Sequence, residues 1–344
     1  MKTLFGNTKN GEAVYAYELK NSKGMKAVVI NYGAILTNLF VPDDKGEVKD
    51  VVLGFDTVKE YEVNPSFFGA TIAPSANRIG NAAFTIDGVN YKVDVNDGPN
   101  NLHSHITEGA HKRIWDAEEG NNSVKFSVQI KDGEMGFPGN KTISVTYTLT
   151  EDNELILEYA GSSDKNTIIN PTNHTYFNLS GEDCGKDILD NVLTLKAANY
   201  TPVVAGSIPT GEIAPVAGTV MDFTKGRRVG EDIDDSFEQL VFTGGYDHNF
   251  VIDNWDKSLK CFAKVEDRKS GRTMEVYTDL PGVQFYAGNF ISPQTGKAGA
   301  KYTKRCGLCL ETQFYPDSVN KPSFPSCVFG PGNDYSSKTV YKFV

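Results

Sequence analysis

Hydrophobic and polar residues alternate over several stretches in the middle of the chain. Residues 124–130, 143–149 and 155–159 place Val, Ile, Leu, Phe or Tyr at every second position, with mostly polar residues between them. A period of two is that of a strand with one buried face, and the abundance of Ser, Thr, Tyr and Val favours antiparallel sheet. Asp87-Gly88 has the composition of a two-residue hairpin turn, and Ser270-Gly271 predicts a second turn.

Helical periodicity is scarce. Residues 57–63 are long enough for about two turns and residues 229–240 predict another helix, but strands and helices do not alternate as in a βαβ chain. No repeat, low-complexity tract or linker divides the sequence. We therefore predict an all-β fold in which residues 1–344 form a single domain, a large antiparallel β-sandwich with few short helices. Long loops at 201–220 and 320–333 are expected on its rim.

The charge and the apolar content of the chain argue against two kinds of binding partner, nucleic acid and membrane. The 44 acidic and 34 basic residues give a formal charge of −10, and no block of Lys and Arg offers a surface for a phosphate backbone, so nucleic acid is not an expected partner. No apolar run of membrane-spanning length is present, and the first residues turn polar before a signal-peptide core could form. We expect a cytoplasmic protein without a membrane partner, whose five cysteines are reduced.

Common cofactor and nucleophile motifs are missing. The sequence contains neither GxGxxG nor GxxxxGK[ST], so a nucleotide cofactor is not expected, and neither GxSxG nor HExxH occurs. His103-Ser104-His105 could start a metal site, but only five histidines are available to complete it. We predict no cofactor and no metal.

Polar residues within apolar segments are the remaining candidates for chemistry. In residues 170–179, Thr172, His174, Tyr176 and Asn178 would share one face of a strand, either as a wall that binds a polyhydroxylated ligand or around a structural histidine. In residues 308–314, Glu311 stands alone on an apolar strand, and from composition the simpler interpretation is an exposed carboxylate on the outer face of a sheet. These alternatives stay open at this level.

Three further segments place donors and acceptors among apolar residues. Asn77-Arg78 lies in a stretch without other charge, and a planar guanidinium is suited to clamp hydroxyls or carboxylates. Asp247 within 244–250 and Gln284 within 282–290 each lie among aromatic residues.

Together these motifs resemble the aldose 1-epimerase, or galactose mutarotase, family. The resemblance runs from about residue 10 to residue 340 and rests on motifs that occur in the family's order. They are Asn77-Arg78-Ile79, Gly98-Pro99-Asn100 with Leu102-His103, the run from Asn173 to Leu179, Tyr246-Asp247-His248-Asn249, the run from Gly282 to Tyr286, and Leu310-Glu311-Thr312-Gln313.

The resemblance implies a β-sandwich whose open cleft binds a free aldose and interconverts its α and β anomers without cofactor or metal. It implies Glu311 as catalytic base, His174 as acid and His103 as a second histidine near the ring oxygen. The implied sugar-binding residues are Asn77, Arg78, Tyr176, Asp247 and Gln284. One departure concerns Ser104 and His105, where the family usually has two glycines, so bulk and strain are expected in the turn that places His103.

The chemistry of mutarotation agrees with these roles. The anomeric hydroxyl loses a proton while the ring oxygen gains one, the ring opens, the C1–C2 bond rotates and the ring recloses. At pH 7 an unperturbed Glu is ionised and an unperturbed His is roughly a quarter protonated, a fraction that a neighbouring carboxylate should raise. Glu311 as base and His174 as acid is therefore the expected polarity, and the roles reverse on closure.

Two other classes remain as alternatives. A noncatalytic sugar-binding relative would keep the aromatic and arginine contacts but would not need Glu311. A glycoside-processing enzyme needs two carboxylates about 5 to 9.5 Å apart, and Asp247 is the only candidate partner of Glu311. Arg78 has no second arginine near it in the sequence. This favours an uncharged sugar, because a sugar phosphate would need further basic residues. The motifs fit galactose, glucose, xylose or a disaccharide alike, because these sugars share most of the hydroxyls that the pocket would contact.

Overall fold

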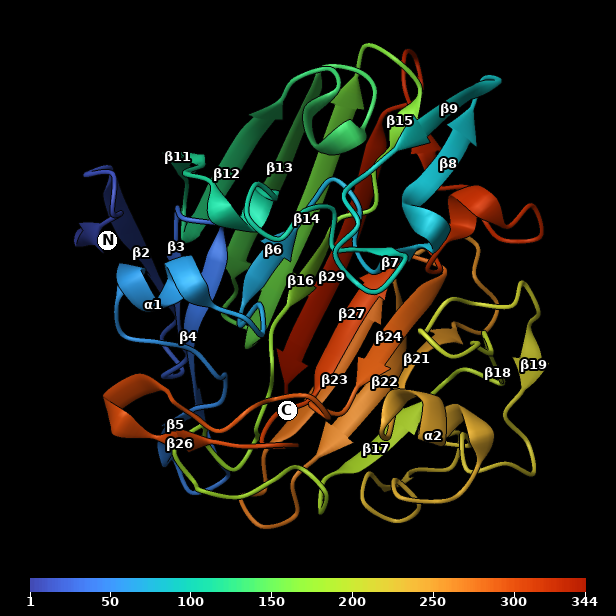
Figure 1. The fold of residues 1–344 in the computed structure, drawn as a ribbon. Coiled ribbons are helices and arrows are strands. Elements are labelled where there is room, and N and C mark those ends of the chain that lie inside the picture. The colour runs from blue at the N-terminus through green and yellow to red at the C-terminus, as the bar shows by residue number, and fades with distance from the viewer.

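The computed structural model describes residues 1–344 and consists mainly of β-strands (Figure 1). The largest sheet has nine strands, in the order β11 (Asp116–Glu119), β12 (Ser123–Ile130), β13 (Lys141–Leu149), β14 (Glu154–Ser163), β29 (Tyr335–Phe343), β23 (Thr273–Thr278), β22 (Lys260–Glu266), β17 (Val192–Leu195) and β20 (Arg227–Arg228). All its neighbouring strands pair antiparallel.

Two five-stranded sheets supply most of the second layer. The N-terminal sheet runs in sequence order through β1 (Lys2–Asn7), β2 (Ala13–Lys20), β3 (Lys26–Ile30), β4 (Ile35–Pro42) and β5 (Val48–Asp50). The other has the order β19 (Ala214–Pro215), β18 (Asn199–Tyr200), β21 (Asp247–Val251), β24 (Gly282–Tyr286) and β27 (Cys309–Gln313).

Short elements complete the fold. The two-stranded sheets pair β6 (Ala70–Ile72) with β16 (Thr172–His174), β7 (Arg78–Ile79) with β10 (Asn101–Leu102), β8 (Ala83–Ile86) with β9 (Val89–Lys92), β15 (Thr167–Ile168) with β28 (Val328–Phe329), and β25 (Gln294–Thr295) with β26 (Lys301–Tyr302). The two α-helices are α1 (Val58–Val63) and α2 (Glu238–Thr243), and five single 3-10 turns lie in the connections. No helix has the length and apolar character needed to span a bilayer.

The two layers pack face to face at the middle of the large sheet and toward one of its edges. In the middle, Thr312 of β27 hydrogen-bonds Thr339 of β29 (2.6 Å), and the Tyr341 hydroxyl donates to the Leu310 carbonyl. Toward the β11 edge, Tyr17 of β2 packs on Phe126 of β12 with ring centroids 5.4 Å apart. A hydrophobic core cluster of 66 buried residues fills the space between the layers. This arrangement confirms the predicted antiparallel β-sandwich.

Most local predictions are confirmed. The alternating stretches form β12, β13 and β14, and β8 and β9 pair Ile86 with Val89 around Asp87 and Gly88, both of which have positive φ as a type I′ turn requires. The helix predicted at 57–63 is α1, and its N-cap Thr57 forms a capping box with Glu60. All five cysteines are free.

The helix predicted over 229–240 is wrong for most of its length. Only the last residues of that stretch belong to α2, which begins at Glu238. The preceding chain instead pairs across the end of the large sheet, where the Val229 and Gly230 amides donate to the carbonyls of Asn191 and Leu189. Contacts with a segment distant in sequence, just before β17, therefore override the local helical periodicity.

Candidate active site

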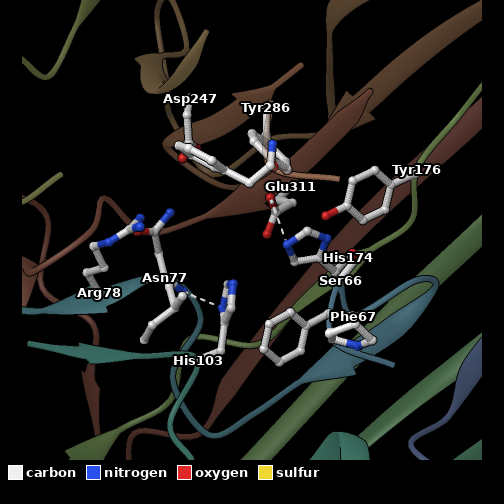
Figure 2. Close-up of a pocket in the computed structure, with 13 residues that line it drawn as sticks. Ser66, Phe67, Asn77, Arg78, His103, His174, Tyr176, Asp247, Tyr286 and Glu311 are labelled. Carbon is white, nitrogen blue, oxygen red and sulfur yellow. Dashed lines mark hydrogen bonds and ion pairs between the residues drawn. The ribbon is translucent and has the colours of Figure 1, made fainter. Parts of the chain in front are cut away.

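A pocket opens on the face of the β27–β24–β21 sheet that is turned away from the core. Along β27, Leu310 and Thr312 contact the large sheet, so the alternating side chains of Cys309, Glu311 and Gln313 point to the other face. The residues that line the pocket are Pro65, Ser66, Phe67, Asn77, Arg78, Leu102, His103, His174, Tyr176, Asp247, Tyr286, Phe290 and Glu311 (Figure 2).

Glu311 and His174 face each other inside this pocket. Glu311 Oε1 lies 3.7 Å from His174 Nε2, and the two residues are only 2% and 5% exposed. Glu311 Oε2 has no hydrogen-bond partner in the protein, so it remains available to a ligand. The interpretation of Glu311 as an exposed residue on an outer sheet face is therefore wrong, because loops from the rest of the chain cover this part of the sheet.

Aromatic rings hold the imidazole of His174 in place. Tyr176 stacks on one side with centroids 5.0 Å apart, and Phe67 stacks at 5.7 Å. Figure 2 shows the hydroxyl of Tyr176 directed toward the carboxylate of Glu311. The strand β16 places His174 by pairing it with Ala70 of β6. The orientation of the ring is thus fixed by packing.

Burial shifts the pKa values of this pair in opposite directions. Desolvation raises the pKa of Glu311 well above its usual value, and the nearby Asp247 carboxylate raises it further. Desolvation lowers the pKa of His174 to about 4, although a hydrogen bond to a backbone carbonyl partly opposes the shift. The expectation that a neighbouring carboxylate would raise the protonated fraction of His174 is therefore wrong. Burial favours the uncharged form of both groups.

His103 has a different hydrogen-bonding state. Its Nδ1 accepts the backbone N–H of Asn77 at 3.1 Å, so the proton of the neutral ring must be on Nε2. Burial lowers the pKa of His103 well below its ordinary value, which keeps the ring neutral. His103 therefore presents an N–H donor rather than a base.

The same tautomer argues against a metal ion in the pocket. Ligand atoms of His103, His174 and Glu311 lie within 4.8 Å of one another. A metal, however, needs the lone pair of an imidazole nitrogen. In His103 one nitrogen accepts the Asn77 amide and the other carries the proton.

Two further charged residues frame the pocket. Arg78 Nε donates to Asp97 at 2.8 Å, which neutralises its charge and fixes its plane. Asp247 Oδ1 accepts from Gln284 Nε2 at 2.7 Å, and burial raises the pKa of Asp247. Gln284 Oε1 in turn accepts from Gln313. Gln284 thus lies behind the pocket and orients Asp247.

The turn that carries His103 is strained at Ser104, as the departure from the family pattern leads us to expect, but His105 does not have a positive φ. His103 and Ser104 have φ values of 53° and 67°, in the left-handed region that favours glycine. Ser104 is fully buried, and its hydroxyl both donates to the Ser75 carbonyl and accepts the Ser75 amide, at 2.8 and 2.9 Å. His105 points elsewhere, and its Nδ1 accepts the backbone amides of Thr107 and Glu108.

Seven of the eight candidate residues line the same pocket, and Gln284 contacts it only through Asp247. The aromatic residues of the pocket that the sequence did not single out as candidates are Phe67, Tyr286 and Phe290; Pro65 and Ser66 also line it. Tyr286 lies two positions after Gln284 on the same strand face, so strand alternation could have revealed it. Phe67 and Phe290 come from connecting segments, for which no periodicity exists. Thr172 and Asn178 instead bond to the backbone away from the pocket.

The fold and the pocket define a class of protein, a β-sandwich with a buried carboxyl–imidazole pair suited to proton transfer. The sequence model of the family described as aldose 1-epimerase matches residues 15–342. The chain is 41% identical over 344 residues to the galactose mutarotase of Rattus norvegicus, an alignment that covers 99% of this chain and 98% of that protein. It is 35% identical over 340 residues to the aldose 1-epimerase of Escherichia coli strain K12, with 97% and 96% covered.

Solved structures agree. An aldose epimerase homologue from C. elegans has a TM-score of 0.88 at 33% identity, covering 96% of this chain and 98% of that chain. The galactose 1-epimerase of Lactobacillus acidophilus has a TM-score of 0.86 at 26% identity, covering 100% and 98%. The chain belongs to the aldose 1-epimerase family.

Proposed function

We propose that Glu311 and His174 form the acid–base pair with which this protein, an isomerase of the aldose 1-epimerase family, interconverts the α and β anomers of a free aldose. The observation that supports the proposal is the 3.7 Å separation of Glu311 Oε1 and His174 Nε2 within one pocket. Anomer interconversion needs one group to accept the proton of the anomeric hydroxyl and another to protonate the ring oxygen.

In the proposed mechanism Glu311 accepts the proton of the anomeric hydroxyl while His174 Nε2 donates a proton to the ring oxygen. The C1–O5 bond breaks and its electron pair remains on the ring oxygen, so that C1 becomes an aldehyde. After rotation about the C1–C2 bond, the hydroxyl attacks the opposite face of the aldehyde. Glu311 then returns its proton to the carbonyl oxygen, and His174 recovers the proton lost by the attacking hydroxyl.

Burial makes a specific contribution to this step. Ring opening moves one proton from His174 to Glu311 through the sugar, and so converts an ion pair into two neutral groups. The pocket raises the pKa of Glu311 and lowers that of His174, which favours the neutral pair. The same environment that makes the ion pair costly therefore favours the ring-opened state.

The remaining residues bind and orient the sugar. We assign His103 as a fixed N–H donor, in agreement with the Asn77 amide on its other nitrogen. Arg78 and Asp247 supply donors and an acceptor for hydroxyls, Asn77 contributes a further amide, and the ring of Tyr176 forms part of the wall.

The charges of the pocket favour an uncharged substrate. Arg78 is the only cationic side chain among the lining residues, and Asp97 already pairs with it. Two carboxyl groups, those of Asp247 and Glu311, line the same space. A sugar phosphate would bring negative charge to them without a free cation to balance it, which supports neutral aldoses such as D-galactose or D-glucose.

Polarimetry of freshly dissolved α-D-galactose and α-D-glucose tests the proposal. Added protein should speed the approach to the same final rotation without any cofactor. If rotation changes no faster with protein while calorimetry detects sugar binding, the protein is a noncatalytic sugar-binding relative. Release of a sugar from a glycoside, with no acceleration of mutarotation, would instead favour the glycoside-processing alternative.

A further inference from the structure

Cys309 contacts the catalytic imidazole from the side opposite to Glu311. It lies two residues before Glu311 on β27, so both side chains point to the same face of the sheet. Cys309 Sγ is 3.6 Å from His174 Nδ1, within hydrogen-bond range for sulfur, and the residue is completely buried. His174 is therefore bracketed, with a sulfur at Nδ1 and a carboxyl group at Nε2.

The proposed chemistry determines which tautomer His174 must have. Nε2 is the nitrogen that faces Glu311, so Nε2 has to lose a proton on ring opening and regain it on closure. A neutral ring can accept a proton at Nε2 only when its own hydrogen is on Nδ1. That hydrogen needs an acceptor in a buried site. Besides the backbone of His174 itself, the sulfur of Cys309 is the atom placed to accept it.

We propose that Cys309 is a positioning residue, whose sulfur accepts the Nδ1–H of His174 and keeps Nε2 free to exchange the catalytic proton. This inference rests on the proposed role of His174. It gives the two pocket histidines opposite tautomers, because His103 must carry its hydrogen on Nε2. One ring is thereby a fixed donor and the other a reversible acid and base.

Sulfur is suited to this position because it is a weak acceptor. A carboxylate at Nδ1 would favour the imidazolium and raise the pKa of His174. A neutral thiol orients the hydrogen without adding charge, and burial raises the pKa of Cys309, which keeps the thiol protonated. The ring can therefore return to its neutral form when the sugar opens.

The test combines NMR spectra of the histidine rings with kinetics. In two-bond ¹H–¹⁵N spectra the five histidines give few signals, and that of His174 is assigned by its loss in His174→Asn. We expect wild-type His174 as the Nδ1–H tautomer and His103 as the Nε2–H tautomer. A wild-type His174 with its hydrogen on Nε2 overturns the inference whatever the activity of the protein.

Variants then measure the contribution of the sulfur. Cys309→Ala should lower kcat about five- to tenfold, the usual effect of one lost hydrogen bond, with KM changed less than about twofold and a mixed tautomer signal for His174. Cys309→Ser, which keeps an acceptor, should recover part of kcat. Cys327→Ala is the matched control, since Cys327 is also buried and free but its sulfur makes no hydrogen bond to His174.

The outcomes separate this inference from the proposed function. If Cys309→Ala keeps both kcat and the Nδ1–H signal, Cys309 is not a positioning residue, although the acid–base pair stands. If wild-type protein shows no mutarotation, the proposed function fails, whereas the tautomer spectra still report on Cys309. Should Cys309→Ala not fold, the wild-type spectrum and Cys309→Ser decide the question.

Discussion

Glu311 is the residue whose replacement most directly tests the proposed chemistry. Glu311→Gln keeps the shape of the side chain but removes the base. We expect kcat to fall by about 10² to 10⁴, while sugar affinity measured by calorimetry stays within a few-fold. Glu158→Gln is the control, because Glu158, on β14, forms only a surface ion pair with Lys338 of β29. A Glu311→Gln protein with wild-type turnover would remove Glu311 from the mechanism.

The pH dependence of kcat/KM tests the shifted pKa values. The mechanism needs one transferable proton shared between Glu311 and His174. Activity is therefore lost at low pH, where His174 becomes protonated while Glu311 is protonated as well. Because the pKa of His174 is lowered to about 4, we expect the rate to stay level from about pH 7 to pH 5 and to fall only near pH 4. The raised pKa of Glu311 moves the alkaline limb upward.

Polarimetry in buffers of constant ionic strength, corrected for the uncatalysed reaction, measures this profile. An acid limb centred near 6.5, the value of an unperturbed histidine, would show that burial does not control His174 in the working enzyme.

For individual residues, the sequence predicted which side chains line the pocket better than it predicted their protonation. Seven of the eight candidates line the pocket. Polar residues within apolar segments drew attention to several of them, but the resemblance to the family, not the pattern, gave the complete set and the roles. The direction of the pKa shift of His174 was not predictable, because it depends on segments that bury the ring from elsewhere in the chain. Phe67 is one of them, and nothing in its local sequence indicates that it stacks on His174.

Among the structural elements, the turn at residues 103–105 is the one that departs from the family pattern. Ser104→Gly would relieve the positive φ but remove both hydrogen bonds to Ser75, leaving a buried amide without its partner. The lost bonds should outweigh the relief, so we expect thermal unfolding to show a destabilisation of about 1 to 2 kcal/mol.

Ser207→Gly is the matched control for this change. Ser207 also has a positive φ, of 61°, but it is less buried and its hydroxyl makes no hydrogen bond. This substitution should be neutral or slightly stabilising. A stabilised Ser104→Gly protein would mean that backbone strain dominates the turn. His105→Gly, which leaves the Ser75 contacts intact, should retain catalytic activity.

Elements whose pattern is local were predictable, and those that depend on distant contacts were not. The hairpin at Asp87-Gly88 and the capped helix at Thr57 carry their own turn and cap residues. The stretch at 229–237 has helical periodicity, but bonds to the chain near Asn191 determine its path. The sequence pattern of 229–237 does not reveal that this stretch is not a helix; only its hydrogen bonds to a distant part of the chain do.

For the whole molecule, Lys297 links a loop late in the chain to the N-terminal sheet. Its buried ammonium group contacts Asp50 at 2.6 Å and donates to the carbonyls of Thr37 and Val52. Lys297→Ala would leave the carboxylate of Asp50, whose side chain is only 10% exposed, without its cation. We expect a loss of about 3 to 5 kcal/mol in the free energy of unfolding, measured by denaturant titration.

Lys301→Ala is the control for this prediction, since Lys301 is exposed and its ammonium group hydrogen-bonds only Thr295. Its effect should stay within about 0.5 kcal/mol. Equal free energies of unfolding for the two variants would show that the Lys297 contacts do not stabilise the fold. Replacing both partners, in Lys297→Met with Asp50→Asn, should recover part of the loss, because no unpaired charge then remains buried.

The layered class of the fold follows from strand alternation, but the order of strands within it does not. The pattern of residues 335–343 identifies a strand without indicating its neighbours. In the structure β29 lies between β14 and β23, in the middle of the large sheet (Figure 1). This strand order depends on packing throughout the core, so the sequence of a single segment does not predict it.

This position of β29 has a consequence for biosynthesis. A ribosome makes β14 and β23 long before β29, so the two halves of the large sheet emerge with facing edges that have no strand to join them. Unpaired edges attract other strands, including those of neighbouring chains. The nascent protein should therefore depend on chaperones until β29 is released and inserted, and premature stop codons before residue 335 should yield aggregates rather than a smaller enzyme.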